Sequence, residues 1–186
     1  MLKEYFNEEK LQELRDSDNL IYKALELSVN LFKNDIDKGG FPYMLHLIYV
    51  YNHVHSIDEK VVALLHDVIE DKNITSDELL DLGFPKKIVD DVVILTRIKN
   101  VDYKNYIDNI IKKGSKEALH VKLADLSNNM DMSRIKNPTI KDKLTILFSL
   151  FDSQFTISSS IITYIIEPAP KHNAHGIRYT TFVARK

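Results

Sequence analysis

Residues 64–71 place polar, metal-binding side chain types inside an otherwise apolar run that reads LLHDVIED. An unpaired charge buried in such a run would cost several kcal/mol. A divalent ion explains the adjacent His66 and Asp67, because imidazole and carboxylate are both good ligands for Mn, Fe or Zn. Helical spacing puts His66 beside Glu70 and Asp67 beside Asp71. The alternative is a helix C-terminus with solvated acids and a histidine satisfied in the core.

A second candidate group lies further along the chain, where residues 122–130 read KLADLSNNM. Asp125 follows an apolar helical face, and Asn129, one turn later, projects to the same side. An aspartate at a core edge is usually a cap or a hydrogen-bond partner, but this helix is predicted to continue beyond it. A third candidate is His46, whose apolar surroundings by themselves favour a satisfied core histidine.

Helices are predicted for every segment that carries these residues. Gly39-Gly40 breaks the chain before Pro42, a residue suited to the first helical position. Thr75-x-x-Glu78 has the form of a capping box. The predicted helices run from the caps Asp18 and Asn19 to about 32, then over 42–53, 58–71, 75–83, 85–97, 103–113 and 115–130. The expected core faces are Leu20, Ala24, Leu27 and Leu31 in the first helix and Leu45, Ile48 and Tyr49 in the second. No strand alternation competes with this pattern, so the predicted fold class is all-α.

Composition agrees with a helical globular protein. Five Gly and five Pro in 186 residues are few beside the roughly 12% of average proteins. The apolar fraction of 44% argues against global disorder. A net charge of -2 offers no footprint for nucleic acid. The absence of Cys excludes disulfides and thiolate sites, and the charged start lacks a signal peptide. We therefore expect a soluble cytoplasmic protein.

The C-terminal part differs from the rest, and we predict a division into residues 1–140 and 141–186. Residues 144–166 carry a single charge, Asp152, over a length that can cross a bilayer. Asp152, Gln154 and three serines would then lie in lipid at substantial cost. A buried or oligomer-forming helix is favoured over a membrane span, so a homo-oligomer is plausible. The basic tail beyond it is interpreted as a disordered arm or a non-native terminus.

The order His46, His66-Asp67, Asp125 resembles the ligand pattern of the HD-domain metal-dependent phosphohydrolases. Glu70-Asp71, directly after the HD pair, makes the chain similar to the hydrolase domain of RelA/SpoT-type alarmone enzymes and their small single-domain relatives. Residues 40–46, GFPYMLH, resemble the family's GxPYxxH, and KLAD…NM follows in the expected order. The resemblance covers about residues 20–135.

The resemblance implies a compact HD-domain helical bundle that holds one divalent ion, usually Mn²⁺, and hydrolyses a nucleotide. The implied ligands are His46, His66, Asp67 and Asp125. Glu70 and Asp71 correspond to the acidic pair that positions and activates the attacking water. Alarmone hydrolases remove the 3′-pyrophosphate from guanosine tetra- or pentaphosphate, and a metal assists by lowering the pKa of bound water.

Substrate-contacting positions match the family less closely. Asn129 corresponds to an Asn that contacts substrate or water. Asp37 stands where an Arg contacts the base, and its neighbour Lys38 is the candidate cation there. Leu47 replaces a common Pro, and Leu126 and Asn128 replace Arg and His. These differences leave the ligand set intact and remove parts of the usual nucleotide pocket.

The leading prediction is therefore a metal-dependent phosphohydrolase acting on a pyrophosphorylated nucleotide such as ppGpp. One alternative is an HD phosphohydrolase with another nucleotide or a phosphate monoester as substrate. Another is a non-catalytic nucleotide-sensing module, which would have no need of the Glu70-Asp71 pair.

The remaining histidines and lysines give weaker signals. His53 and His55 flank a helix end and are interpreted as surface residues, and His120 is five residues from Asp125 and so points to another face. Phosphate contacts are one interpretation of the scattered lysines, and simple solvation is the favoured one; these are Lys99, Lys104, Lys112, Lys113 and Lys122.

Overall fold

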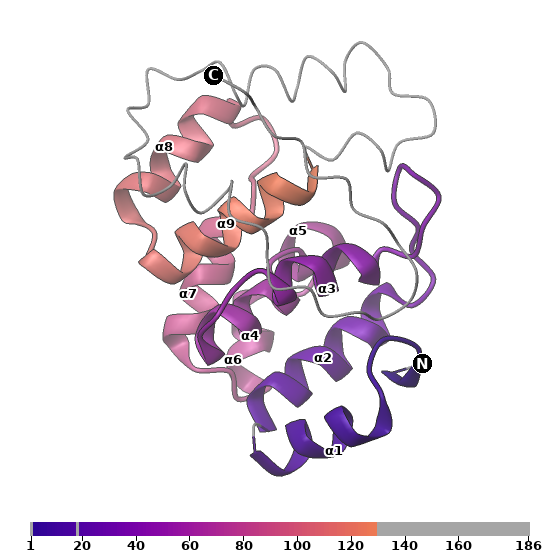
Figure 1. The fold of residues 1–186 in the computed structure, drawn as a ribbon. Helices are drawn as coiled ribbons and strands as arrows, with labels where there is room; N and C mark the ends of the chain where they lie inside the picture. Colours follow the sequence, from indigo (N-terminus) through magenta and orange to yellow (C-terminus); the bar gives the residue numbers. More distant parts are fainter. Residues whose placement is uncertain (1, 18, 130–186) are drawn as a thin grey trace, which may run out of the picture. The chain divides into compact units, whose positions relative to one another are not determined.

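The computed structural model describes residues 2–17 and 19–129 (Figure 1). The elements are η1 (Leu2–Glu4), α1 (Glu8–Ser17), α2 (Asn19–Phe32), α3 (Met44–Asn52), α4 (Ile57–Leu65), α5 (Val68–Lys72), α6 (Ser76–Asp81), α7 (Lys86–Leu95), α8 (Tyr103–Lys113) and α9 (Lys116–Asn129). Strand-like pairing within these ranges is limited to one isolated bridge between Ile36 and Pro42. The predicted all-α class is confirmed.

Helix α4 is the central element of the described residues. It packs against α2, α3, α7 and α9 (Figure 1). Every side chain from Val61 to Leu65 is fully buried. Because this buried stretch ends at Leu65, the next two residues, His66 and Asp67, begin at the core.

Side-chain caps set where several helices begin. Thr75 and Glu78 form the predicted capping box of α6, and Gly83, with φ of +81°, follows the end of that helix. Ser56 and Glu59 form a second capping box at α4, which the sequence analysis did not identify. Each box satisfies backbone N–H groups that have no partner inside the helix.

Most predicted helices are present with small shifts at their ends. Helix α8 has the predicted bounds, and α3, α6, α7 and α9 differ from prediction by no more than two residues at each end. Helix α2 also matches, although its predicted cap Asp18 lies outside the described residues. The sequence analysis did not predict η1 or α1.

The prediction of a single helix over residues 58–71 is wrong. The structure has two helices, α4 and α5, separated by a turn at His66 and Asp67. Neighbouring residues in a continuous α-helix point about 100° apart. The break lets both side chains converge, and His66 Nε2 lies 3.1 Å from Asp67 Oδ2.

The predicted core faces of α2 and α3 are confirmed in part, because Ala24 is fully buried and five others are partly buried against the core: Leu20, Leu27, Leu31, Ile48 and Tyr49. The buried apolar residues of α2 are Ile21, Ala24, Leu25, Val29 and Phe32, and those of α3 are Met44, Leu47, Val50 and Tyr51. Leu45, expected in the core, is 39% exposed. Both helices are apolar around much of their circumference, so periodicity alone does not specify the buried face.

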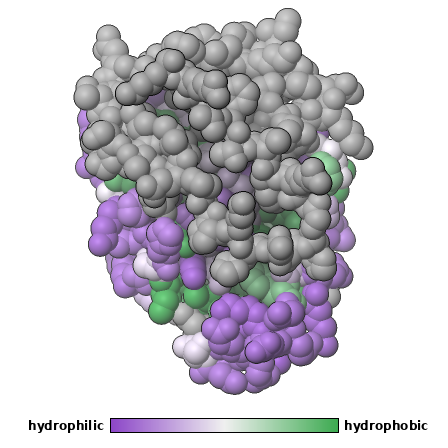
Figure 2. Space-filling view, in the orientation of Figure 1, coloured by the Kyte–Doolittle hydropathy of each residue, from purple (hydrophilic) through white to green (hydrophobic). Residues whose placement is uncertain are grey.

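Predictions for residues 130–186 lie outside the described residues. They include the boundary at residue 140, the apolar segment 144–166 and the basic tail. Within the described ranges, no helix has both the length and the apolar character needed to cross a bilayer. The coloured surface in Figure 2 is largely hydrophilic with scattered hydrophobic side chains.

Glu59 links α4 to α9, and its replacement tests this connection. Its Oε2 accepts from the backbone of His55 and Ser56, and its Oε1 accepts from His120 Nδ1 at 2.6 Å. Burial favours the neutral acid, but the hydrogen bond from His120 and those from the backbone outweigh it, so the pKa of Glu59 is lowered. We expect Glu59→Gln to lower the free energy of unfolding by about 1–3 kcal/mol at neutral pH.

Urea denaturation measures this loss. Because the folded-state pKa is lowered, the loss should be complete above the usual pKa of a glutamate and should shrink as pH falls below it, toward the lowered folded-state pKa. Glu78→Gln is the matched control, since Glu78 has the same place in an exposed capping box and Gln can retain that role. Equal losses in the two variants would contradict a special role for Glu59.

Candidate metal centre

The four residues predicted as metal ligands come from three separate parts of the fold. His46 lies in α3, His66 and Asp67 form the turn between α4 and α5, and Asp125 lies in α9. His46 Nε2 is 3.3 Å from His66 Nε2, 3.4 Å from Asp125 Oδ1 and 3.6 Å from Asp67 Oδ2. The structure therefore brings these four side chains together, and we call them the His–Asp cluster.

The spacing within the His–Asp cluster fits a divalent ion. One donor atom each from His46, His66 and Asp125 lies within 4.8 Å of the other two. With metal–ligand bonds of about 2.1 Å, adjacent ligand atoms of an octahedron lie about 3.0 Å apart. The observed separations of 3.1–3.6 Å are slightly wider, so small side-chain movements would close them around an ion. Two imidazoles with two carboxylates suit Mn, Fe or Zn.

Each imidazole is held from outside the His–Asp cluster. His66 Nδ1 donates to the carbonyl oxygen of Ala63 at 2.8 Å, and His46 Nδ1 lies 2.8 Å from Asn128 Oδ1. Such contacts orient a ligating ring and select its tautomer. In both rings the Nε2 atom is the one that faces the His–Asp cluster.

Asp67 is held by Tyr43, which precedes α3. The Tyr43 hydroxyl donates to Asp67 Oδ2 at 2.6 Å and lies 3.4 Å from Asp71 Oδ2. Its ring stacks on Phe32 with centroids 5.0 Å apart. Burial and the charge of Asp67 raise the pKa of Tyr43, so the hydroxyl keeps its proton and remains a donor.

Lys122 was predicted to be solvated, and this is wrong. Its Nζ donates to Asp125 Oδ2 at 2.7 Å, and its side chain is only 17% exposed. The ammonium also lies 5.2 Å from the centre of the Tyr106 ring. Burial opposes the charge, but Asp125 outweighs it and raises the pKa of Lys122. A step of three residues on α9 is what brings the two groups together.

Charges within the His–Asp cluster depend on one another. Burial disfavours a charged His66, but Asp67 and Asp125 outweigh it and raise the pKa of His66 to about 9. Burial likewise opposes ionisation of the two carboxyls. The facing imidazoles hold the pKa of Asp67 well below its usual range, and Lys122 with the imidazoles lowers that of Asp125. The cluster thus favours positive charge at its centre, as a proton or as a metal ion.

The predicted acidic pair lies beside the His–Asp cluster at its exposed side. Glu70 Oε2 accepts from the backbone N–H of Arg97 at 2.8 Å, while Asp71 shares the Tyr43 hydroxyl with Asp67. Burial and the nearby Asp67 raise the pKa of both acids. Both side chains are solvent-exposed and so remain accessible to water and to a substrate.

The two predicted substrate contacts occupy different surroundings. Asn129 Nδ2 donates to Asp125 Oδ1 at 2.6 Å, which agrees with the predicted projection of the two residues to one side. Lys38 is exposed in the turn before α3. His120 binds Glu59 instead of approaching Asp125, as expected.

Tyr43, Lys122 and Asn128 are the contributors that the sequence analysis did not identify. Each stood in a motif already recognised, GFPYMLH or KLADLSNNM. The available signal was their proximity in sequence to a predicted ligand. Their hydrogen bonds across the site depend on tertiary structure, which periodicity does not reveal.

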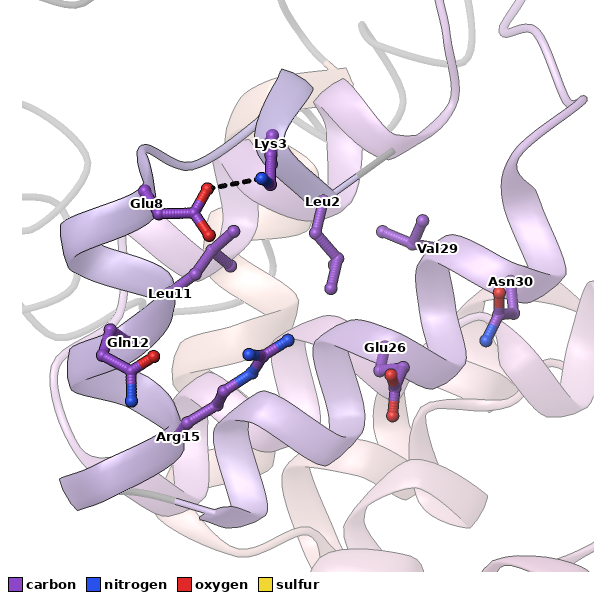
Figure 3. A pocket seen from close by; sticks show the side chains of 9 residues that line it. All are labelled: Leu2, Lys3, Glu8, Leu11, Gln12, Arg15, Glu26, Val29 and Asn30. Atoms are coloured by element: carbon purple, nitrogen blue, oxygen red, sulfur yellow. Dashed lines mark ion pairs between the residues drawn. The ribbon is translucent and has the colours of Figure 1, made fainter.

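A cavity of about 280 Å³ lies elsewhere, among η1, α1 and α2 (Figure 3). Its lining mixes apolar side chains, such as Leu11 and Val29, with the charged Lys3, Arg15 and Glu26. None of its lining residues belongs to the His–Asp cluster. Lys3 and Glu8 form an ion pair at its edge.

Removing Lys122 tests the charge balance of the cluster. We expect Lys122→Met to lower the free energy of unfolding by about 3–5 kcal/mol, because it removes the ammonium that is bonded to the buried Asp125 carboxylate. Urea denaturation in the presence of a chelator measures the loss. The control Lys104→Met removes one partner of an exposed pair with Asp108 and should cost less than about 1 kcal/mol. Similar losses in both variants would contradict the ion pair's importance.

Comparison with known proteins supports the fold. No family model and no curated protein matches the chain. Among solved structures, it matches one described as a metazoan ortholog of SpoT that hydrolyses ppGpp and plays a role in starvation responses. The TM-score is 0.64 at 20% identity, over 78% of this chain and 91% of that chain. At this identity the likeness shows a shared fold, and the implied helical bundle is confirmed.

Proposed function

We propose that the protein is a divalent-metal-dependent phosphohydrolase that removes the 3′-pyrophosphate of guanosine tetra- or pentaphosphate. The observation that carries this proposal is the convergence of the His–Asp cluster from three segments, with the acidic pair Glu70-Asp71 at its exposed side. The shared fold with a protein described as hydrolysing ppGpp supports the choice of substrate.

The His–Asp cluster would hold the ion. Manganese is the ion implied by the family resemblance, and the donor set also suits iron or zinc. An ion held there supplies two kinds of assistance, a lower pKa for water and neutralisation of charge on the phosphate. Tyr43 and Lys122, bonded to Asp67 and Asp125, would keep the two carboxylates oriented.

Glu70 would accept the proton of the attacking water. Its raised pKa makes its carboxylate a stronger base than an ordinary glutamate, which suits proton transfer near neutral pH. The hydrogen bond from Arg97 N to Oε2 fixes the orientation of the carboxylate. Asp71, held through the Tyr43 hydroxyl, would help to orient the water.

Asn129 and Lys38 would contact the substrate. Asn129 is exposed and bonded to Asp125, which supports a role for its amide in contacting a phosphate bound to the His–Asp cluster. Lys38 is an exposed cation on the turn that leads to Tyr43. Its charge would complement a phosphate group distant from the bond that is cleaved.

A different nucleotide or a phosphate monoester is the second candidate substrate. The favouring observation is Asp37, which accepts from the backbone N–H groups of Gly39 at 2.8 Å and Phe41 at 2.9 Å. Alarmone hydrolases have at this position an Arg that contacts the base. Here the side chain stabilises its own turn, so recognition of guanine would need other groups.

Product release from ppGpp with Mn²⁺ tests the function. We expect pyrophosphate release by the full chain and none by Asp67→Ala. Glu70→Gln should reduce kcat by about 10²- to 10⁴-fold while Mn²⁺ affinity stays unchanged, because it removes only the proton acceptor. Glu78→Gln, in an exposed capping box, is the control for loss of a glutamate.

Three outcomes would change this assignment. Turnover by Asp67→Ala would refute the site, and a wild-type rate in Glu70→Gln would refute its role as a base. Release from other phosphorylated nucleotides, but not from ppGpp, would support the second candidate.

Metal binding itself is measured without substrate. Mn²⁺ at about 100 times its Kd stabilises a folded protein by about 2.7 kcal/mol, which should raise the Tm by about 5 °C or more. Asp125→Ala should abolish the rise. Asp90→Ala, at an exposed pair with Lys86, should retain it. An unchanged Tm in the wild-type protein would argue against the metal site.

A further inference from the structure

We propose that Asn128 is a positioning residue that fixes the tautomer of His46 and thereby makes Nε2 the nitrogen available to a cation. The inference rests on the proposed function, because it concerns a divalent ion held by the His–Asp cluster. Asn128 itself touches neither the ion nor the substrate in this proposal, and its effect passes through His46.

The geometry of the contact defines which atom carries the proton. Asn128 lies in α9 and is 3% exposed, and its Oδ1 is 2.8 Å from Nδ1 of the buried His46 in α3. An amide oxygen can only accept a hydrogen bond, and a neutral imidazole has one donor and one acceptor nitrogen. Nδ1 of His46 therefore carries the proton, and Nε2 keeps its lone pair.

That lone pair is directed into the His–Asp cluster. Nε2 of His46 lies 3.4 Å from Asp125 Oδ1 and 3.3 Å from His66 Nε2. In the opposite tautomer, Nε2 would carry a proton and could donate it to His66 Nε2. Both rings would then be unable to bind a cation, so the tautomer of His46 decides whether the cluster is competent.

In their neutral forms, which a cation requires, the two rings obtain the same tautomer in different ways. His66 Nδ1 donates to the backbone carbonyl of Ala63, which is an acceptor whatever side chains surround it. His46 depends on the side chain of Asn128, whose amide presents either an acceptor or a donor according to its orientation. The tautomer of His46 can therefore be changed by substituting Asn128.

A purely structural role for Asn128 is the competing explanation. As a polar link between the packed helices α3 and α9, it would affect stability and leave the imidazole tautomer unchanged. Asn128→Asp retains an oxygen acceptor in nearly the same shape, whereas Asn128→Leu has similar volume and no acceptor. The two variants, compared for metal affinity and for ring protonation, separate the explanations.

The test uses the full-length chain and two measurements. Calorimetric titration with Mn²⁺ should show affinity reduced about 10- to 100-fold in Asn128→Leu and at least retained in Asn128→Asp. Nitrogen-15 NMR of the histidine rings in the metal-free protein, assigned with His46→Gln, should show neutral His46 protonated at Nδ1 in the wild-type protein and in Asn128→Asp, and a larger share protonated at Nε2 in Asn128→Leu. Asn105→Leu, exposed on α8, is the control and should bind Mn²⁺ as the wild-type protein does.

Two results would overturn the inference, namely wild-type Mn²⁺ affinity in a folded Asn128→Leu, or a neutral His46 protonated mainly at Nε2 in the metal-free wild-type protein. If Asn128→Leu does not fold, the NMR result on the wild-type protein still decides, together with the affinity and ring protonation of Asn128→Asp. A wild-type protein that binds no divalent ion would refute the proposed function itself, which distinguishes the two failures.

Discussion

The burial of two carboxylates within an apolar helical bundle is the constraint on which the rest of this structure depends. The Asp67 and Asp125 side chains are 18% and 7% exposed, and ionised groups in such positions are costly unless they are paired. Two imidazoles and one buried ammonium supply the compensation. With these groups in place, the centre of the His–Asp cluster still favours added positive charge. The arrangement that stabilises the two carboxylates therefore also suits the cluster to a metal ion.

The His–Asp cluster is assembled from one turn of the backbone and from helices that pack on α4. The buried C-terminal half of α4, residues 61–65, leads directly into His66 and Asp67, and the turn there allows their adjacent side chains to converge. Helices α3 and α9, which both pack on α4, add His46 and Asp125. Because every supporting element is packed against the same core helix, small displacements of any one ligand are resisted by close packing.

The side chains of the site range from buried ones in its interior to exposed ones at its edge. The cluster and its supports, including Asn128, form hydrogen bonds within the protein. Three side chains of the site are exposed, namely Glu70, Asp71 and Asn129. Glu70 accepts a hydrogen bond from Arg97 N, Asp71 contacts the Tyr43 hydroxyl, and Asn129 donates to Asp125. Such an arrangement leaves the groups proposed to contact water and substrate in reach of solvent, as the proposed hydrolysis would require.

The sequence by itself determined the helical class, most helix bounds and the candidate ligands, because apolar periodicity, capping residues and motif order are local properties. Tertiary structure alone decided the break at His66 and Asp67, the buried faces of α2 and α3, and the partners Tyr43, Lys122 and Asn128. Those features depend on which helices meet around α4. Lys122, which appears solvated in sequence, is mostly shielded from solvent in the fold, because its charge pairs with the buried carboxylate of Asp125 three residues away.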